Sequence, residues 1–213
     1  TSFPLFKENN LSQEILTPKI SFRINPNDNM KNHSSAGASI TANNIYEINR
    51  LPISDSFEGG KSLTLGFDYR LDYEEKIIEV ENNENNENNE KQKDKFLEFK
   101  LATVLRDKIE NNIPTSSTMD KKSSNLFGSI DNNLFENVNL SYNFSIDNDL
   151  ETFESHALMS EISINNFVTT FNYIEQRNEL GSGHALSNTT SYKINENSSF
   201  SFATRRNIEI SLI

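Results

Sequence analysis

The sequence predicts an all-β protein, an antiparallel meander of about nine or ten strands. Three observations carry this prediction. Apolar and polar residues alternate without an error from Leu63 to Tyr73. The same alternation recurs along the chain, and turn-forming Asn residues separate the segments. No stretch has the 3.6-residue apolar period of a helix or the spacing of a βαβ unit.

Each alternating segment is expected to be a strand with one apolar and one polar face. The two clearest segments are 63–73, whose even positions are Thr64, Gly66, Asp68, Arg70 and Asp72, and 138–146, whose odd positions are Asn and Ser. Residues 150–164 change parity between Phe153 and Leu158, which predicts a β-bulge. Weaker alternation predicts further strands in segments 20–24, 97–105, 167–173, 186–194 and 200–202.

The connections between these segments alternate in length. The short turns are expected at Asn132–Glu136, Asn165–Asn166 and Asn195–Asn197. The mostly longer loops are expected at Leu51–Gly60, Asp107–Ser123, Asp147–Asp149 and Arg177–Gly183. Short turns at one end of a sheet and long loops at the other are typical of outer-membrane β-barrels.

One tract has no apolar residue and differs from the rest of the chain. Residues 81–94 consist of Asn and Glu followed by Lys, Gln and Asp. Such a segment cannot bury apolar surface, so we expect a disordered loop insertion at 81–94. The tract lacks the glycine turn and the Asp-rich loop of a calcium site.

Composition excludes several classes of function. The net charge of −11 argues against a nucleic-acid binder, which needs a basic face. The chain has no Cys, and His33, His156 and His184 lie far apart, so we expect no disulfide, no metal site and no cofactor. No apolar run is long enough for a transmembrane helix, but a transmembrane strand needs only about 9–11 alternating residues.

The apolar face of each strand suits either lipid or a protein core. In a membrane barrel, Val138, Leu140, Tyr142, Phe144 and Ile146 lie on the convex face with Leu63, Leu65, Phe67 and Leu71. In the alternative, a secreted or surface β-sandwich acting as an adhesin or carbohydrate-binding module, two packed sheets bury these residues. Long strands and an unbroken polar face favour the barrel.

Two motifs are more specific than the alternation. The first runs from Asn43 to Arg50 and then to the strand that begins near Ser62. The second combines Leu101–Arg106 with Lys122–Gly128. Together they resemble the C-terminal barrel of the LPS-assembly protein LptD family, with Asn125 in place of the usual Asp. The motif positions are Asn49, Arg50, Asp55, Glu58, Gly59, Gly60, Ser123, Ser124 and Gly128. The segment Ile20–Pro26 is similar to the start of the same region, so the resemblance covers most of the chain.

The resemblance implies that residues 1–213 are part of a C-terminal barrel domain in the outer membrane of a Gram-negative bacterium. It implies a non-enzymatic role in inserting lipopolysaccharide into the outer leaflet, with lipopolysaccharide, membrane lipid, an LptE-like plug lipoprotein and periplasmic bridge proteins as partners. The chain begins at Thr1 and ends without a terminal aromatic residue. We therefore expect the N-terminal periplasmic domain and the last strands to lie outside it.

The polar strand faces are expected to line the lumen of the barrel. The charged candidates are Asp68, Arg70, Asp72, Glu98, Lys100 and Arg106. Catalysis by Ser155 and His156 is not expected, because neighbouring strand residues point to opposite faces. The turn Glu58–Gly60 lacks the Lys and the following helix of a phosphate-binding loop.

Overall fold

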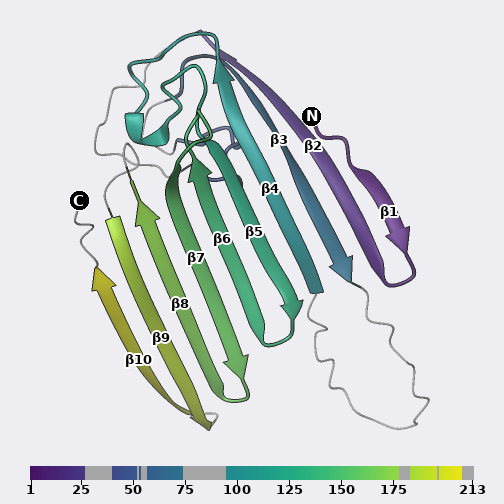
Figure 1. Cartoon of the computed structure of the whole chain (residues 1–213), viewed down its shortest axis with the longest axis vertical. Helices are drawn as coiled ribbons and strands as arrows, with labels where there is room; N and C mark the ends of the chain where they lie inside the picture. Colours follow the sequence, from purple (N-terminus) through teal and green to yellow (C-terminus); the bar gives the residue numbers. More distant parts are fainter. Residues whose placement is uncertain are drawn as a thin grey trace.

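The computed structural model describes residues 1–26, 40–51, 53, 57–73, 95–177, 183–195 and 197–207. These residues form one ten-stranded antiparallel sheet in which each strand pairs with its neighbour in the sequence (Figure 1). The strands are β1 (Leu5–Asn9), β2 (Ser12–Asn25), β3 (Gly60–Tyr73), β4 (Lys95–Arg106), β5 (Leu126–Phe135), β6 (Val138–Ile146), β7 (Phe153–Ile164), β8 (Phe167–Gln176), β9 (Gly183–Asn195) and β10 (Ser198–Asn207). The predicted all-β meander is confirmed.

The strand connections alternate between the two ends of the sheet, as predicted. The short hairpins between β5 and β6 and between β7 and β8 lie at the lower end in Figure 1, and the β4–β5 connection lies at the upper end. The latter contains a short 3₁₀ helix, Thr115–Ser117. The predicted turn at Asn165–Asn166 is present, and Asn165 takes the positive φ of 51° that Asn tolerates.

Several predicted boundaries were wrong. The turn predicted at Asn132–Glu136 lies at Glu136–Asn137, because Asn132 still pairs with Leu97 and Leu140 and belongs to β5. Strand β2 begins at Ser12, earlier than the predicted start at Ile20, and β1 was not predicted. The predicted disordered insertion at 81–94 falls outside the described residues.

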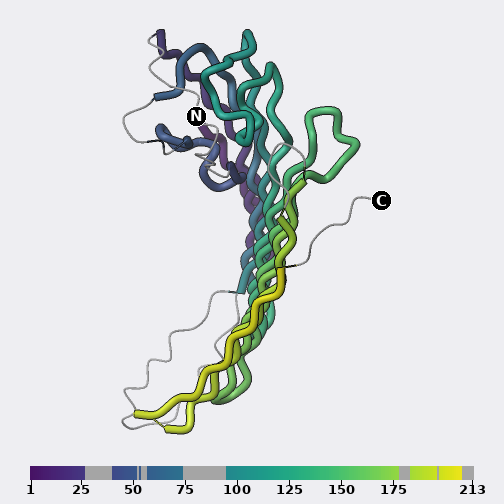
Figure 2. The backbone as a smooth tube through the Cα atoms, turned by 90° about the vertical axis from the view of Figure 1, so that its left-hand side faces the viewer, coloured from purple at the N-terminus to yellow at the C-terminus, as the bar shows by residue number. Residues whose placement is uncertain are grey.

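The strand register confirms the predicted division into two faces. Leu65 lies opposite Thr103, Phe67 opposite Leu101 and Tyr69 opposite Phe99, and the same face continues across β5 to Leu140, Tyr142 and Phe144 of β6. The other face carries Asp68, Arg70, Asn139, Ser141 and Asn143. Figure 2 shows the sheet edge-on, with residues 40–51 in dark blue against its concave side. Since Arg50 contacts Thr64, the polar face is the concave one.

The predicted bulge lies at the start of β7. Ser155 pairs with Ser145, but the next pair is Phe153 with Ile146, so Glu154 is the extra residue. The bulge restores the register, because it returns Phe153 to the face of Leu158 and Ile162. It also leaves the Glu154 side chain buried.

The convex face is covered by no second sheet among the described residues, which argues against the sandwich alternative. Large apolar side chains stand exposed on it, including Phe22, Ile24, Phe171, Leu186, Phe200 and Phe202. The described sheet is open, with β1 and β10 as its edges. No helix in the described part of the chain is long and apolar enough to cross a membrane.

The compact core lies on the concave side, at the end of the sheet with the long connections. Its strand residues are Ala102, Val104 and Phe127. The remaining members come from the two connections that fold over these strands, and they are Ile40, Ala42, Ile45, Leu51, Ile53, Ile113 and Met119. The concave face is therefore not uniformly polar, because apolar residues of β4 and β5 serve as a floor for these connections.

Candidate functional site

Five of the six predicted lumen residues form a band of charge across β3 and β4 on the concave face. Asp68 pairs with Lys19 of β2, and Arg70 Nε donates to Asp72 Oδ1 at 2.8 Å. The Lys100 ammonium lies 2.9 Å from the Glu98 carboxylate and donates to Asn43 Oδ1 at 2.9 Å. Opposite charges thus alternate across neighbouring strands, which neutralises the band locally.

The sixth residue, Arg106, belongs to a buried cluster around Glu58. The Glu58 carboxylate accepts hydrogen bonds from Arg50 Nε at 2.8 Å, from Arg50 Nη2 at 2.5 Å and from Arg23 Nη1 at 2.9 Å. Arg106 Nη2 also donates to Glu58, and Arg106 Nη1 donates to the Gly59 carbonyl at 3.1 Å. One carboxylate therefore joins three guanidinium groups from β2, β4 and the connection before β3. We call these four residues the Glu58 cluster.

Burial makes this cluster a strong electrostatic feature. Arg50 is 1% exposed and Glu58 is 6% exposed. Arg50 satisfies its remaining donors with Thr64 Oγ1 at 2.9 Å and Ser62 Oγ at 3.0 Å. Burial by itself raises the pKa of the Glu58 carboxyl, but the hydrogen bonds and charge of Arg50, with the charges of Arg106 and Arg23, outweigh it. The pKa of Glu58 therefore lies below its usual value, and Glu58 is ionised at neutral pH.

Tyr46 fastens the same connection farther along β3. A β-carbon on Gly66 would lie 2.5 Å from the Tyr46 hydroxyl oxygen, so only glycine leaves room for the phenol at this point of the strand. Lys19 Nζ lies 5.6 Å from the centre of the Tyr46 ring. Burial, helped by the negative charge of Asp68, raises the pKa of Tyr46 to about 12.

The second motif fastens the β4–β5 connection to the sheet. Ser124 Oγ accepts a hydrogen bond from the Val104 N–H at 2.9 Å, and Ser123 bridges to Leu105. Asn125 Nδ2 donates to Glu154 Oε2 at 2.6 Å and to Ser145 Oγ at 2.9 Å. Asn125 therefore supplies donors to a carboxylate on the β7 bulge.

The remaining motif residues have separate places. Gly59 accepts the bond from Arg106, and Gly60 begins β3 with a φ of 82° that favours glycine. Gly128 lies on β5 against the ring of Phe144, and Asn49 is exposed in a turn. Asp55 falls outside the described residues.

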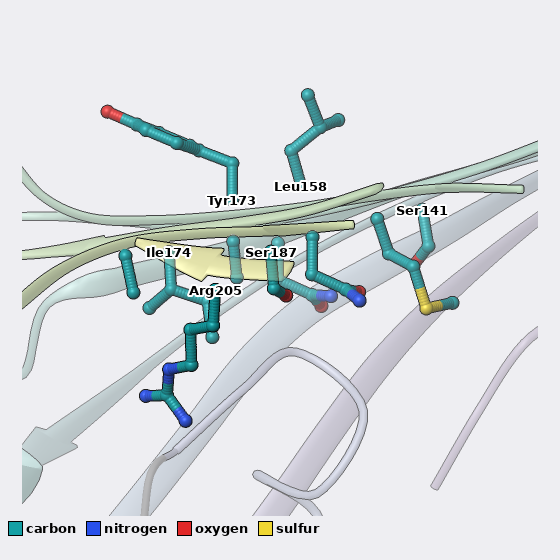
Figure 3. Close-up of a pocket in the computed structure, with 11 residues that line it drawn as sticks. Ser141, Leu158, Tyr173, Ile174, Ser187 and Arg205 are labelled. Atoms are coloured by element: carbon teal, nitrogen blue, oxygen red, sulfur yellow. The ribbon is translucent and has the colours of Figure 1, made fainter. Parts of the chain in front are cut away.

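Among the described residues, no cover like that over β3–β5 stands over β6–β10. A hollow of about 410 Å³ lies over these strands, and apolar side chains such as Ala157 and Ile174 line it together with hydroxyl and amide side chains. Figure 3 shows Ile174, Ser187 and Arg205 on one side of the sheet and Tyr173 and Leu158 on the other. The first group faces the concave side, because the row of paired residues from Arg205 runs through Ser187, Asn172 and Met159 to the concave residue Ser141.

The described residues contain no group of three or more acidic or His side chains placed to hold a metal ion. His156 lies on the convex face, where its Nδ1 is 2.6 Å from the Tyr142 hydroxyl. Ser155 pairs with Gln176 and His156 with Glu175, so the two side chains point to opposite faces of the sheet. This arrangement does not bring a nucleophile and a base together.

Sequence reasoning missed the assembly of the Glu58 cluster. It placed Arg50, Glu58 and Arg106 in motifs or on a face, but it did not name Arg23 or bring the four together. It also missed Glu154 as the partner of Asn125. The alternation along β2 offered one indication for Arg23. Arg23 pairs with Ser62, so it lies on the concave face with the rest of the cluster.

Comparison with known proteins identifies the family of this chain. A search of the curated proteins found no match to this chain. Residues 2–207 match the family model described as LptD, LPS transport system D. This match covers nearly the whole chain, including the Glu58 cluster and all ten strands. The chain therefore belongs to the LptD family, which serves lipopolysaccharide transport and assembly at the outer membrane.

Proposed function

We propose that this chain forms a section of a barrel wall through which lipopolysaccharide is inserted into the outer leaflet of the bacterial outer membrane. The observation that carries the proposal is the contrast between the two faces of one curved sheet. The convex face exposes large apolar side chains such as Phe200, Phe202 and Leu186. The concave face carries hydroxyl, amide and charged groups. An apolar exterior and a polar interior are the pattern of a transmembrane β-barrel.

In this proposal the sugar part of lipopolysaccharide passes along the concave side while its acyl chains stay near the lipid. The open face of β6–β10 suits a sugar, because Asn143, Asn172 and Ser187 offer neutral donors and acceptors. The charged band on β3 and β4 would line the lumen. This assignment is supported by the register, which puts these residues on the concave face. The role is non-enzymatic, since the lipid is moved without being altered.

The proposed partners follow from family membership. Lipopolysaccharide is the cargo, and an LptE-like lipoprotein is the proposed plug of the lumen, where it would face the concave side of this sheet. Periplasmic bridge proteins would engage a periplasmic domain outside residues 1–213. Membrane lipid would contact the convex face.

A photo-crosslinking experiment on adjacent residues tests the proposal. Leu186 lies on the convex face and Ser187 on the concave face of β9. A photoreactive amino acid at position 187 should cross-link lipopolysaccharide only while export continues. The same amino acid at position 186 should cross-link membrane lipid whether or not export continues. Equal, export-independent cross-linking from both positions would contradict the proposed route.

A further inference from the structure

The connection between β2 and β3 folds back over the sheet, and its described residues 40–51 form a cover on the concave face. We call residues 40–51 the inner cover (dark blue in Figure 2). Ile45 and Leu51 of the cover are fully or nearly fully buried against strand residues that include Ala102 and Val104. The cover therefore limits access to this half of the concave face, together with the β4–β5 connection that contributes Ile113 and Met119.

Polar contacts also hold the inner cover, and between its two ends Arg23 Nη2 of β2 donates to the Glu47 carbonyl at 2.6 Å. Near its start, Asn43 accepts a hydrogen bond from Lys100 of β4 at 2.9 Å. At its end, Arg50 joins the Glu58 cluster. The Asn43 contact is exposed and contributes little, whereas the Arg50 contact is buried and charged on both sides.

Glu58 is the acidic residue to which all three arginines of the cluster donate, whereas Glu110 lies near Arg106. Arg23, Arg50 and Arg106 all donate to its two carboxylate oxygens. Without the negative charge, three guanidinium groups would face one another in a buried site. Their repulsion and lost hydrogen bonds would act on the cover through Arg50, because β2 and β4 are held in the sheet by backbone pairing.

We propose that Glu58 is the positioning residue that keeps the inner cover closed over β3–β5. In the intact cluster, Glu58 binds Arg50 of the cover to Arg23 and Arg106 of the sheet. When its charge is removed, the cover opens and exposes the floor at Ala102 and Val104. In a barrel, an open cover would also let large hydrophilic molecules enter the lumen. This second effect rests on the proposed barrel function, but the opening of the cover does not.

Thiol labelling measures this opening directly, because residues 1–213 contain no native cysteine and mass spectrometry of peptides from this segment reads the introduced thiol alone. In the full-length protein, an Ala102→Cys variant places a thiol beneath the cover at a position that is 2% exposed. A maleimide reagent should label this thiol slowly. Adding Glu58→Gln should raise the labelling rate by about 10- to 100-fold, as expected for the loss of charge-assisted buried hydrogen bonds. The matched control Glu136→Gln, at an exposed acidic residue paired with Lys95, should leave the rate unchanged.

A double variant separates this specific role from a general loss of stability. Adding Arg106→Gln to Glu58→Gln removes one of the three repelling charges and leaves the hydrogen bond from Arg23 to the Glu47 carbonyl of the cover in place, so labelling should fall below that of Glu58→Gln alone. If Arg106 and Glu58 only added independent stability, the double variant would label faster than either single one. That result would overturn the proposal.

A second variant covers the case in which Glu58→Gln does not assemble. Arg50→Lys keeps the charge but cannot make the two-pronged contact with Glu58, and it should also raise labelling at position 102. Unchanged labelling in an assembled variant of either kind would overturn the proposal. Increased labelling with unchanged uptake of a large hydrophilic antibiotic would support the positioning role and count against the proposed barrel lumen.

Discussion

The amide of Asn125 donates a 2.6 Å hydrogen bond to the carboxylate of Glu154, and this contact joins the start of β5 to the bulge of β7. Both side chains are buried, at 1% and 7% exposure. An amide can donate where a carboxylate can only accept, so the pair is satisfied without burying two negative charges together. The bulge turns the Glu154 side chain toward Asn125. Residue 125 must therefore supply a hydrogen-bond donor to this carboxylate.

Asn125→Asp should destabilise the protein by about 3 kcal/mol, because it places two carboxylates in contact in a buried site. Denaturant unfolding of the purified protein in detergent measures this change. Asn125→Asp combined with Glu154→Gln restores one donor and one acceptor, so it should recover most of the loss. A double variant as unstable as Asn125→Asp alone would contradict the pairing.

Gly66→Ala should destabilise the protein by about 2 kcal/mol, since the added carbon overlaps the Tyr46 hydroxyl and the Leu101 carbonyl. Thermal unfolding in detergent provides the measurement. Gly183→Ala is the matched control, because its nearest neighbour would lie 3.8 Å away. Equal effects at the two glycines would show that Tyr46 does not pack tightly on β3.

Acid should weaken the Glu58 cluster. The pKa of folded Glu58 is lowered, so its contribution to stability is complete above the unfolded value of about 4.3 and is lost as the pH falls through the lower folded value. The difference in unfolding free energy between the wild type and Glu58→Gln should therefore be constant from pH 7 to about pH 5 and shrink below about pH 4. A difference that grows in acid would have the wrong sign.

A charge introduced on the convex face should be far more harmful than one on the concave face. Under the proposed barrel function, Leu140→Arg places a charge in lipid and should cost about 2–4 kcal/mol near the bilayer midplane. Ser141→Arg points the same charge toward the concave side, next to Asp131, and should be tolerated. Each variant is assembled into membranes, and its unfolding free energy is compared with that of the wild type. A larger loss for Ser141→Arg than for Leu140→Arg would mean that the two faces are assigned the wrong way round.

Residues 1–213 expressed alone should aggregate in buffer and should not form a closed, heat-resistant barrel in detergent. The described sheet has two unpaired edges and an exposed apolar face, and each unsatisfied backbone group in lipid costs several kcal/mol. Size-exclusion chromatography and heat-modified gel mobility test this. A monodisperse monomer that unfolds cooperatively in plain buffer would contradict the expectation.

The sequence by itself determined most of the strands, their order and their faces, although it missed β1. An alternation of period two, such as that of Leu63–Tyr73, needs no information from distant residues, because successive side chains of any strand point to opposite faces. The same rule located the bulge in β7, since a change of parity has few other physical explanations. The motifs around Arg50 and Gly128 were sufficient to indicate the family.

Only the tertiary structure decided which polar residues meet. Arg23 and Glu58 are separated by a long connection. Asn125 directly precedes β5, and Glu154 lies in β7, which is not adjacent to β5 in the sheet. No local pattern encodes such contacts, because they depend on the register of several strands and on the way each connection folds back. The inner cover was hidden in the sequence for the same reason. The sequence shows that Ala102 and Val104 interrupt the polar face, but only the fold shows that residues 40–51 pack on them.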